Sequence, residues 1–456
     1  MRIKLFLASY VTVVVLIVGS ASLLSAQNIT PPPDSARAPK DSIIYNPLEK
    51  ARAAMAAADT ARKAFPSINF IDSAHAYFLS ERMNLAGEIN RSFMHDAGDY
   101  LRFSPSNFII EDYLTPSRKT VSPFALPGNR MNVIFNNRSL HPISHLPEPD
   151  NQIDFNEIPT APVKEIYNLD GPLGMALEGH SAVGSLFLVP QSPDSNLPIS
   201  KAVIDKGAYG YANTMGSFAA RWRNGVGFRG SAEYRKVSDL ENRADDSYHH
   251  WVELYYPVSK RIALNLSGRV YSREGGYLYL PDYYASPLDR FRRDRDLTAG
   301  VEWRHSGSNR SELEFRHQRS ESRIALGSTY FRNLDIINNA LCYAYETPFG
   351  PGLTRTTVEF SQGEFSDGGR INKRWNLAAD SRFLAAYRKE AIIGYARLEK
   401  TEGFDISPGF SLNYIRNDDR FYFSTGVGYN TQNPAQYETD LQFKSGSLQN
   451  AATPDY

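Results

Sequence analysis

The chain has 456 residues, of which 42% are hydrophobic, and its mean hydropathy of −0.42 is too low for a membrane protein built of helices. Lys and Arg together number 50, as do Asp and Glu, so the charge indicates neither a nucleic acid nor an acidic partner. The lone Cys342 excludes an internal disulfide and a cysteine-based metal site.

Residues 1–26 have the pattern of a signal peptide. Arg2 and Lys4 precede an apolar stretch from Leu5 to Leu24, and the small residues Ser25-Ala26 follow it. This order predicts export and removal of the segment from the mature protein. A single N-terminal anchor helix is the alternative, but the polar, proline-rich stretch that comes next favours cleavage.

Residues 27–67 are predicted to be a linker rich in proline and alanine with one short helix. The run Pro31-Pro32-Pro33 indicates extended chain. Leu48–Ala64 is rich in alanine and favours a helix, which Phe65-Pro66 ends. Because its apolar side chains are small, this helix has little to bury, and both a docked and a fraying helix remain open.

Residues 68–190 predict a small α+β domain. Apolar residues at helical spacing predict a helix within Phe93–Phe103. Three short apolar runs, at Met131–Phe135, Val163–Tyr167 and Ser185–Val189, predict buried strands.

From residue 199 to 456 apolar and polar residues alternate with a period of two, which is typical of strands with one apolar and one polar face. About fourteen such strands are predicted, each long enough to cross a bilayer when tilted. Leu297, Ala299, Val301 and Trp303, for example, alternate with Thr298, Glu302 and Arg304.

Energetics decide which face meets lipid. A charged side chain on the lipid side costs about 2–4 kcal/mol at mid-depth, so the face that carries Arg and Glu is expected to line water or a polar filling. The 27 tyrosines and 25 phenylalanines suit an aromatic girdle. We therefore predict a mainly β fold: a closed transmembrane antiparallel β-barrel preceded by the small α+β domain. A large soluble β-sandwich or solenoid is the alternative.

The connections between strands are predicted to alternate between short and long, as in barrels with turns on the periplasmic side and loops outside. The short turns are placed at Asn224-Gly225, Ser259-Lys260, Gly307-Ser308, Phe349-Gly350, Lys389-Glu390 and Asp418-Asp419, and the long loops near residues 236–248, 272–293, 319–332, 364–373, 400–407 and 431–436.

Three motifs stand in a fixed order before the strands: Phe93–Pro105, Arg130–Leu140, and a stretch from Ile158-Pro159 through Gly171-Pro172 to Gly184–Leu188. In this order they resemble the plug domain of TonB-dependent outer-membrane receptors. With the strands, the resemblance covers about residues 68–446. It implies a plug inside the barrel, capture of substrate by outer loops, and uptake energised by an inner-membrane complex of the TonB type.

The chain departs from that family at several points. Asn136-Asn137 stands where the family usually has Asp-Gly, and Asn168-Leu169-Asp170 stands where it favours a strand running into its Gly-Pro. Barrels of this family have about 22 strands. The barrel is therefore expected to be incomplete, in a truncated gene product or an incomplete sequence.

Two groups of residues are candidates for binding. The resemblance makes Asp41, Ser42, Ile43 and Ile44 a candidate energy-coupling segment, because a short extended run can pair with a partner's strand edge; an ordinary linker is the alternative. Tyr277, Tyr279, Tyr283 and Tyr284 are candidate outer-loop ligand contacts that would stack on a ring or sugar face, or pack the loop onto the rim.

Charges of both signs share that predicted loop: Asp282, Asp289, Asp294 and Asp296 with Arg290, Arg292, Arg293 and Arg295. The simplest interpretation is a solvated outer loop whose charges pair with one another. Contact with a ligand or cation is the alternative.

Catalytic chemistry is not indicated. Gly179–Val183 matches a nucleophile elbow in part, but Val183 stands where the motif needs glycine. His249-His250, His305 and His317 have no ligand spacing for a metal. The sequence predicts neither an enzyme nor a cofactor.

The function favoured by the sequence is that of a TonB-dependent-receptor-like protein in the bacterial outer membrane, which takes up a scarce bulky solute such as a metal chelate or oligosaccharide. Its expected partners are outer-membrane lipid, an inner-membrane energy-coupling protein and an unknown ligand, with no nucleic acid. A passive porin and a barrel-anchored adhesion protein are the alternatives.

Overall fold

The computed structural model describes only part of the chain, and all described residues belong to one unit, residues 54–456. No described helix is long and apolar enough to cross a membrane. The predicted signal peptide and linker lie outside the described residues. The residues that the structure describes are 82–84, 97–101, 107–111, 119–123, 131–140, 154–177, 184–192, 198–208, 210–222, 224–238, 244–276, 288–305, 309–326, 329–349, 352–367, 370–387, 389–417 and 421–431.

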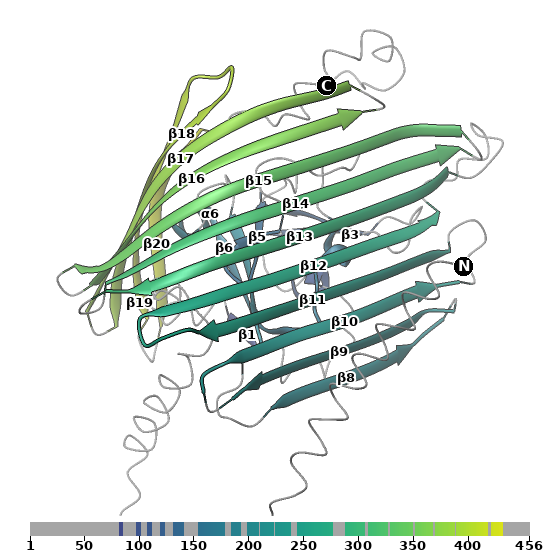
Figure 1. The fold of residues 1–456 in the computed structure, drawn as a ribbon, viewed down its shortest axis with the longest axis horizontal. Coiled ribbons are helices and arrows are strands. Elements are labelled where there is room, and N and C mark those ends of the chain that lie inside the picture. Colours follow the sequence, from purple (N-terminus) through teal and green to yellow (C-terminus); the bar gives the residue numbers. More distant parts are fainter. Residues whose placement is uncertain are drawn as a thin grey trace, which may run out of the picture. The chain divides into compact units, whose positions relative to one another are not determined.

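The first part of the described chain forms a small α+β domain around a five-stranded sheet of order β1-β6-β7-β4-β5 (Figure 1). Strands β4 and β7 are parallel and the other pairs are antiparallel. Its elements are β1 (Arg82–Asn84), α5 (Ala97–Leu101), β2 (Asn107–Glu111), β3 (Lys119–Pro123), β4 (Met131–Phe135), β5 (Arg138–Ser139), the 3-10 helix η4 (Phe155–Glu157), β6 (Val163–Asp170), α6 (Gly171–Leu177) and β7 (Gly184–Pro190).

The three strands expected from short apolar runs are confirmed as β4, β6 and β7. Val133 of β4 and Leu186 of β7 are fully buried, as the continuous apolar runs of these two strands predict, whereas β6 alternates and leaves Lys164 and Asn168 partly exposed. Strand β6 also continues through Asn168-Leu169-Asp170 into Gly171, so the departure expected there does not interrupt the strand. The helix within Phe93–Phe103 is confirmed but short.

Gly174 sits where α6 packs on the sheet with no space for a side chain. A Cβ atom there would lie 2.5 Å from the carbonyl oxygen of Leu169 and 2.6 Å from the amide nitrogen of Ser185. Both are backbone atoms and cannot turn away.

We therefore expect Gly174→Ala to destabilise the small domain by about 1–3 kcal/mol through overpacking. The measurement is the urea midpoint of the detergent-solubilised protein. Gly216→Ala is the matched control, because the nearest atom to its added Cβ lies 3.7 Å away. Equal midpoints for the two variants would contradict the close approach of α6.

The second part forms a thirteen-stranded antiparallel sheet in which each strand pairs with its neighbours in sequence (Figure 1). Its strands are β8 (Ile199–Lys206), β9 (Ala212–Arg221), β10 (Gly227–Val237), β11 (Asp245–Pro257), β12 (Ile262–Gly276), β13 (Leu288–Arg304), β14 (Arg310–Leu326), β15 (Thr329–Phe349), β16 (Gly352–Asp367), β17 (Arg370–Tyr387), β18 (Glu390–Thr401), β19 (Ile406–Asn417) and β20 (Tyr422–Asn430).

The two faces of this sheet differ as the alternating pattern predicts. On one face charged side chains are buried, among them Arg229, Glu253 and Arg292. On the other face large apolar side chains are exposed and stand in rows across the strands. One row joins partners along the registers of six strands: Leu266, Ala299, Phe315, Leu341, Phe360 and Leu377.

The expected sorting of connections by length is wrong for most of the sheet. The six short turns fall where predicted, but only residues 238–244 and 277–287 separate strands by long segments on the opposite edge. Strand β14 ends at Leu326 and β15 begins at Thr329, so the loop expected near 319–332 is mostly paired strand. Residues 319–323 are polar on both faces of the strand, yet their backbone hydrogen bonds extend the ladder regardless of side-chain polarity.

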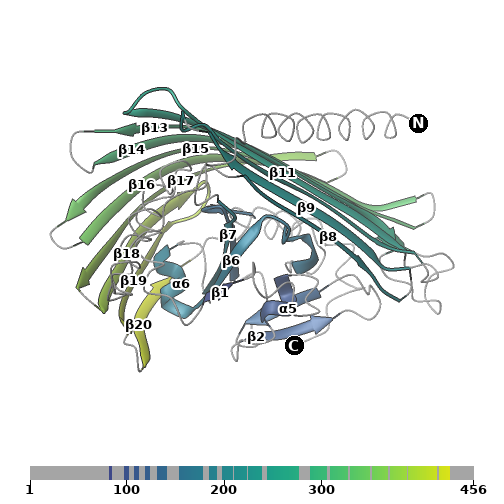
Figure 2. The ribbon, with the colours of Figure 1, turned by 90° about the horizontal axis from the view of Figure 1, so that it is seen from below.

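The sheet also differs from a closed barrel of about fourteen strands. Among the described residues it has thirteen, and β8 and β20 each pair with one neighbour only. The sheet is strongly curved, and the small domain lies on its concave side (Figure 2). Two apolar contacts hold them together: Trp251 of β11 joins the core of the small domain, and Leu173 of α6 packs with Ile393 and Ile415 of β18 and β19.

Candidate functional site

The tight turn between β4 and β5 positions the main polar contact between the two parts. Asn136 and Asn137 both have positive φ, 51° and 64°, as in a type I′ hairpin turn. Asparagine tolerates this conformation better than other residues with a side chain. Asn136-Asn137 therefore forms the tight turn that Asp-Gly would form. The side chain of the next residue, Arg138, reaches the concave face of the thirteen-stranded sheet, which is called the wall from here on.

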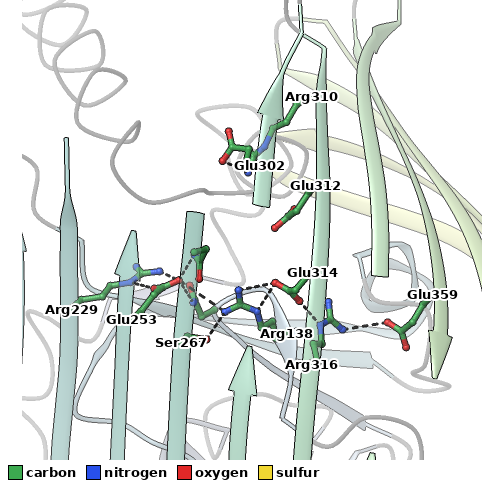
Figure 3. Close-up of polar contacts among 12 residues, drawn as sticks. Arg138, Arg229, Glu253, Ser267, Glu302, Arg310, Glu312, Glu314, Arg316 and Glu359 are labelled. Atoms are coloured by element: carbon green, nitrogen blue, oxygen red, sulfur yellow. Dashed lines mark hydrogen bonds and ion pairs between the residues drawn. The ribbon is translucent and has the colours of Figure 1, made fainter. Parts of the chain in front are cut away.

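Arg138 joins three strands of the wall (Figure 3). Its Nε and Nη2 atoms both donate to Oε2 of Glu314 on β14, at 3.0 and 2.8 Å. Its Nη1 donates to the hydroxyl of Ser267 on β12 at 3.1 Å and lies 4.0 Å from the carboxylate of Glu253 on β11. Arg138 is thus an anchor of the small domain.

The network continues along the wall in both directions from Arg138 (Figure 3). On one side Glu253 accepts hydrogen bonds from Arg229, from Asn136 at 3.0 Å and from Asn265 at 2.9 Å. On the other side Arg316 bonds to Glu314 and reaches Glu359 of β16 at 3.3 Å. The wall alone therefore pairs each acid with one arginine, and Arg138 supplies a second positive charge between the two.

Burial sets the strength of this contact. Glu253 is 2% exposed and Glu314 is 5% exposed. Burial alone lowers the pKa of Arg138, but the carboxylates of Glu314 and Glu253 more than offset it and raise its pKa above the usual value. The arginine therefore stays charged, and its charge-assisted hydrogen bonds persist over the whole physiological pH range.

A second ionic contact lies near the opposite edge of the sheet and has the reverse polarity. Here the small domain supplies the acids, Asp154 and Glu157 beside and within η4. The wall supplies Arg273, Arg290 and Arg292. Since Ser267 and Arg273 are six residues apart on β12, about 20 Å separates the two contacts.

This second contact corrects the prediction of a mixed-charge loop. Residues 288–296 belong to β13, and Arg290, Arg292 and Asp294 point to the concave side, where they are buried. The charges pair partly with one another, as expected for Arg292 and Asp294 at 3.0 Å, but also with the small domain. The signal was a period of two: charges at positions 290, 292, 294 and 296 share one strand face.

The remaining candidate residues are placed as follows. Asp41–Ile44, the four loop tyrosines from Tyr277 to Tyr284, and Gly179–Val183 lie outside the described residues. His249 and His250 lie within the paired strand β11, on opposite faces. In the described part of the chain no three His, Cys, Asp or Glu side chains are close enough to bind a metal together.

Sequence reasoning missed Arg138 and its partners. The alternation predicts that the strand face with Arg and Glu points inward, but nothing local indicates that Arg138, 115 residues before Glu253, lies between Glu253 and Glu314. The arrangement has no nucleophile beside a base; its chemistry is that of a buried electrostatic clamp between two parts of one chain.

Comparisons with known proteins address the fold. No profile of a known protein family matches the sequence, and no curated protein does. Several solved structures match. One is the copper transporter OprC, which matches at 13% identity and a TM-score of 0.62 over 78% of this chain and 64% of that one. The siderophore receptor PirA from Pseudomonas aeruginosa matches at 13% identity and a TM-score of 0.59, over 78% and 62%.

The alcaligin outer-membrane receptor FauA from Bordetella pertussis matches at 9% identity and a TM-score of 0.53, over 75% of this chain and 60% of that one. The chain thus spans about three fifths of the length of these receptors. Its fold is that of the TonB-dependent receptors, with a small domain against the inner wall of an antiparallel barrel sheet.

Proposed function

We propose that this protein is an outer-membrane receptor of the TonB-dependent type, which imports a scarce bulky solute by energised uptake. The observation that carries the proposal is the clamp at Arg138, whose buried ion pairs hold the small domain against the concave face of the sheet. A domain held in this way obstructs the lumen, so passage needs work to move it. An open porin has no need of such a clamp.

The outer membrane is the proposed location for two reasons. Residues 1–26 have the pattern of an export signal. The exposed rows of Leu, Phe and Val on the convex face form the apolar belt that a strand-built membrane protein presents to lipid. Outer-membrane lipid is therefore a proposed partner.

The solute is proposed to be a metal chelate, an oligosaccharide or a similar bulky molecule. The solved structures with this fold include siderophore receptors and a copper transporter, which supports a chelate first. Tyr277, Tyr279, Tyr283 and Tyr284 remain the proposed outer-loop contacts with it.

The direct test of this function is solute flux across proteoliposomes that contain the purified protein. We expect no steady passive flux of small sugars and ions, because the small domain obstructs the lumen. Steady flux would instead identify a porin. If deletion of residues 277–287 reduces cell attachment and leaves uptake unchanged, the protein is an adhesion protein.

The energy source is proposed to be an inner-membrane protein of the TonB type, which pairs with Asp41–Ile44 by strand addition. Replacing Ile43 with proline removes a backbone donor that such pairing needs. We expect Ile43→Pro to reduce cellular uptake of labelled ferric chelates at least tenfold and to leave their binding to cells unchanged. Ile43→Val keeps the donor and serves as the control; equal uptake by both variants would contradict the assignment of this segment.

A further inference from the structure

The second ionic contact, between three wall arginines and two carboxylates of the small domain, has the composition of an anion-binding site. The two carboxylates occupy the positions that a bound anion would take. Arg273 on β12 and Arg290 and Arg292 on β13 are each at most 3% exposed. Their guanidinium groups meet two carboxylates of the small domain. Arg290 Nη2 lies 3.1 Å from Oε1 of Glu157, Arg292 Nη1 forms an ion pair with Oε2 of Glu157, and Arg273 Nη1 donates a hydrogen bond to Asp154.

The wall holds these arginines in place without the small domain. Arg273 donates from Nε and Nη2 to Asp245 of β11, at 2.8 and 2.5 Å. Arg292 donates from Nη2 to Asp294 at 3.0 Å. These three arginines and the two wall carboxylates, Asp245 and Asp294, together have a net charge of +1, and Asp154 and Glu157 bring the sum for the seven side chains to −1. The wall is a preorganised receptor for anions, and the two small-domain carboxylates are its present ligands.

Two further polar side chains near this contact, Tyr271 and His249, have polar atoms without a hydrogen-bond partner among the described residues. Tyr271 on β12 is 2% exposed, and its hydroxyl has no hydrogen-bond partner among the described residues. Tyr271 shares its face of β12 with Arg273 and stands opposite Asp294 of β13 and His249 of β11 in the strand registers. Neither ring nitrogen of His249, 6.3 Å from the Tyr271 ring between centroids, has a partner in the described part of the chain.

A buried polar group without a partner is costly, so a ligand that supplies partners for these groups would gain binding energy. The Tyr271 hydroxyl, and the His249 imidazole beside the Tyr271 ring, add donors near the arginines and no fixed negative charge. A solute that carries carboxylate, catecholate or phosphate groups could take these donors together with the arginine forks, whose geometry matches two-oxygen anions. A neutral oligosaccharide could not replace two carboxylates on buried guanidinium groups without leaving their charge uncompensated.

We propose that Asp154 and Glu157 are built-in competitors of a polyanionic solute, which replaces them on Arg273, Arg290 and Arg292 when the η4 segment withdraws from the wall. The inference rests on the proposed receptor function and narrows its substrate to anions. Exchange of one carboxylate set for another keeps the charge of the site nearly constant, so the small domain can leave the wall without stranding buried arginines.

The test uses citrate as a small tricarboxylate probe and the full chain in detergent, with binding measured by calorimetry. Neutralising the competitors in Asp154→Asn/Glu157→Gln is expected to lower the Kd for citrate at least tenfold, and Glu157→Gln alone to lower it about threefold. The control is Glu364→Gln, which neutralises an acid of β16 in the exposed ion pair with Lys373, outside both contacts, and is expected to leave citrate binding unchanged. Far-UV circular dichroism verifies that each variant is folded.

Further variants locate the citrate. Arg290→Gln in the Glu157→Gln background is expected to abolish the gain, and Tyr271→Phe to reduce it. The proposal is overturned if the neutralised variants bind citrate no more tightly than the wild type, or if the gain survives Arg290→Gln. Citrate binding in detergent requires no energy source. If the variants bind citrate as expected but cells show no energised uptake, the result counts against the proposed function alone.

Discussion

Replacing Arg138 with methionine is expected to lower the free energy of unfolding by about 3 kcal/mol, the lower end of the range for breaking a buried ion pair. The loss arises because Glu253 and Glu314 would remain charged and buried after their shared arginine is removed. It stays at the lower end because Arg229 and Arg316 still pair with them. Methionine preserves most of the side-chain volume, so the effect reports charge and hydrogen bonding.

Trp251 provides the measurement. Its ring contacts Phe135 of the small domain, with 5.0 Å between the ring centroids, and it lies 5.4 Å from the guanidinium carbon of Arg229. Tryptophan fluorescence during urea titration in detergent therefore reports release of the small domain. We expect the Arg138→Met transition at lower urea than the wild-type one.

Two further variants decide whether the clamp is electrostatic. Adding Glu314→Gln to Arg138→Met should recover part of the loss, because one unpaired buried charge disappears. Lys373→Ala breaks an exposed ion pair with Glu364 and is expected to change stability by less than about 1 kcal/mol. A loss at Arg138 as small as the loss at Lys373 would show that the buried pair contributes nothing to docking.

Replacing Leu341 with arginine is expected to destabilise the membrane-inserted protein by about 2–4 kcal/mol. Leu341 is 49% exposed and stands between Phe315 and Phe360 in an apolar row of the convex face. In lipid the charge of the introduced arginine would lose its hydration. At an exposed position in water, an arginine substitution changes the stability by no more than about 0.5 kcal/mol.

The measurement is equilibrium folding into lipid vesicles. Ile371→Arg is the matched control, because Ile371 is also exposed on the convex face but lies next to the end of β17, where the cost is about 0–1 kcal/mol. Equal, small effects of the two substitutions would mean that the convex face does not meet lipid.

The sequence predicts local structure well where one residue type repeats with a fixed period. Met131–Phe135 is predicted to its bounds because a continuous apolar run has few alternatives inside a core. The faces of β13 follow from Leu297 to Arg304 in the same way. The prediction of long loops fails because residues 319–323 are polar on both faces, yet their backbone still pairs with β13 and β15.

The clamp and the anion-like cluster depend on contacts between residues more than a hundred positions apart. A period of two places Glu253 and Glu314 on the inner face, but it does not say which group satisfies them. Asn136-Asn137 gave an indirect indication: a tight turn at this point presents the next side chain outward from the small sheet. Only the folded chain shows that this side chain is an arginine between two wall acids.

The two ionic contacts have opposite polarity, and they therefore favour one orientation of the small domain relative to the wall. Its basic tip, Arg138, faces wall acids near one rim, and its acidic tip at η4 faces wall arginines near the other. Inserted upside down, Arg138 would meet Arg273 and Arg292, while Glu157 would meet Glu253 and Glu314. Neither tip would then find the surplus of opposite charge that it meets in the observed orientation, so the two ionic contacts favour one of the two orientations.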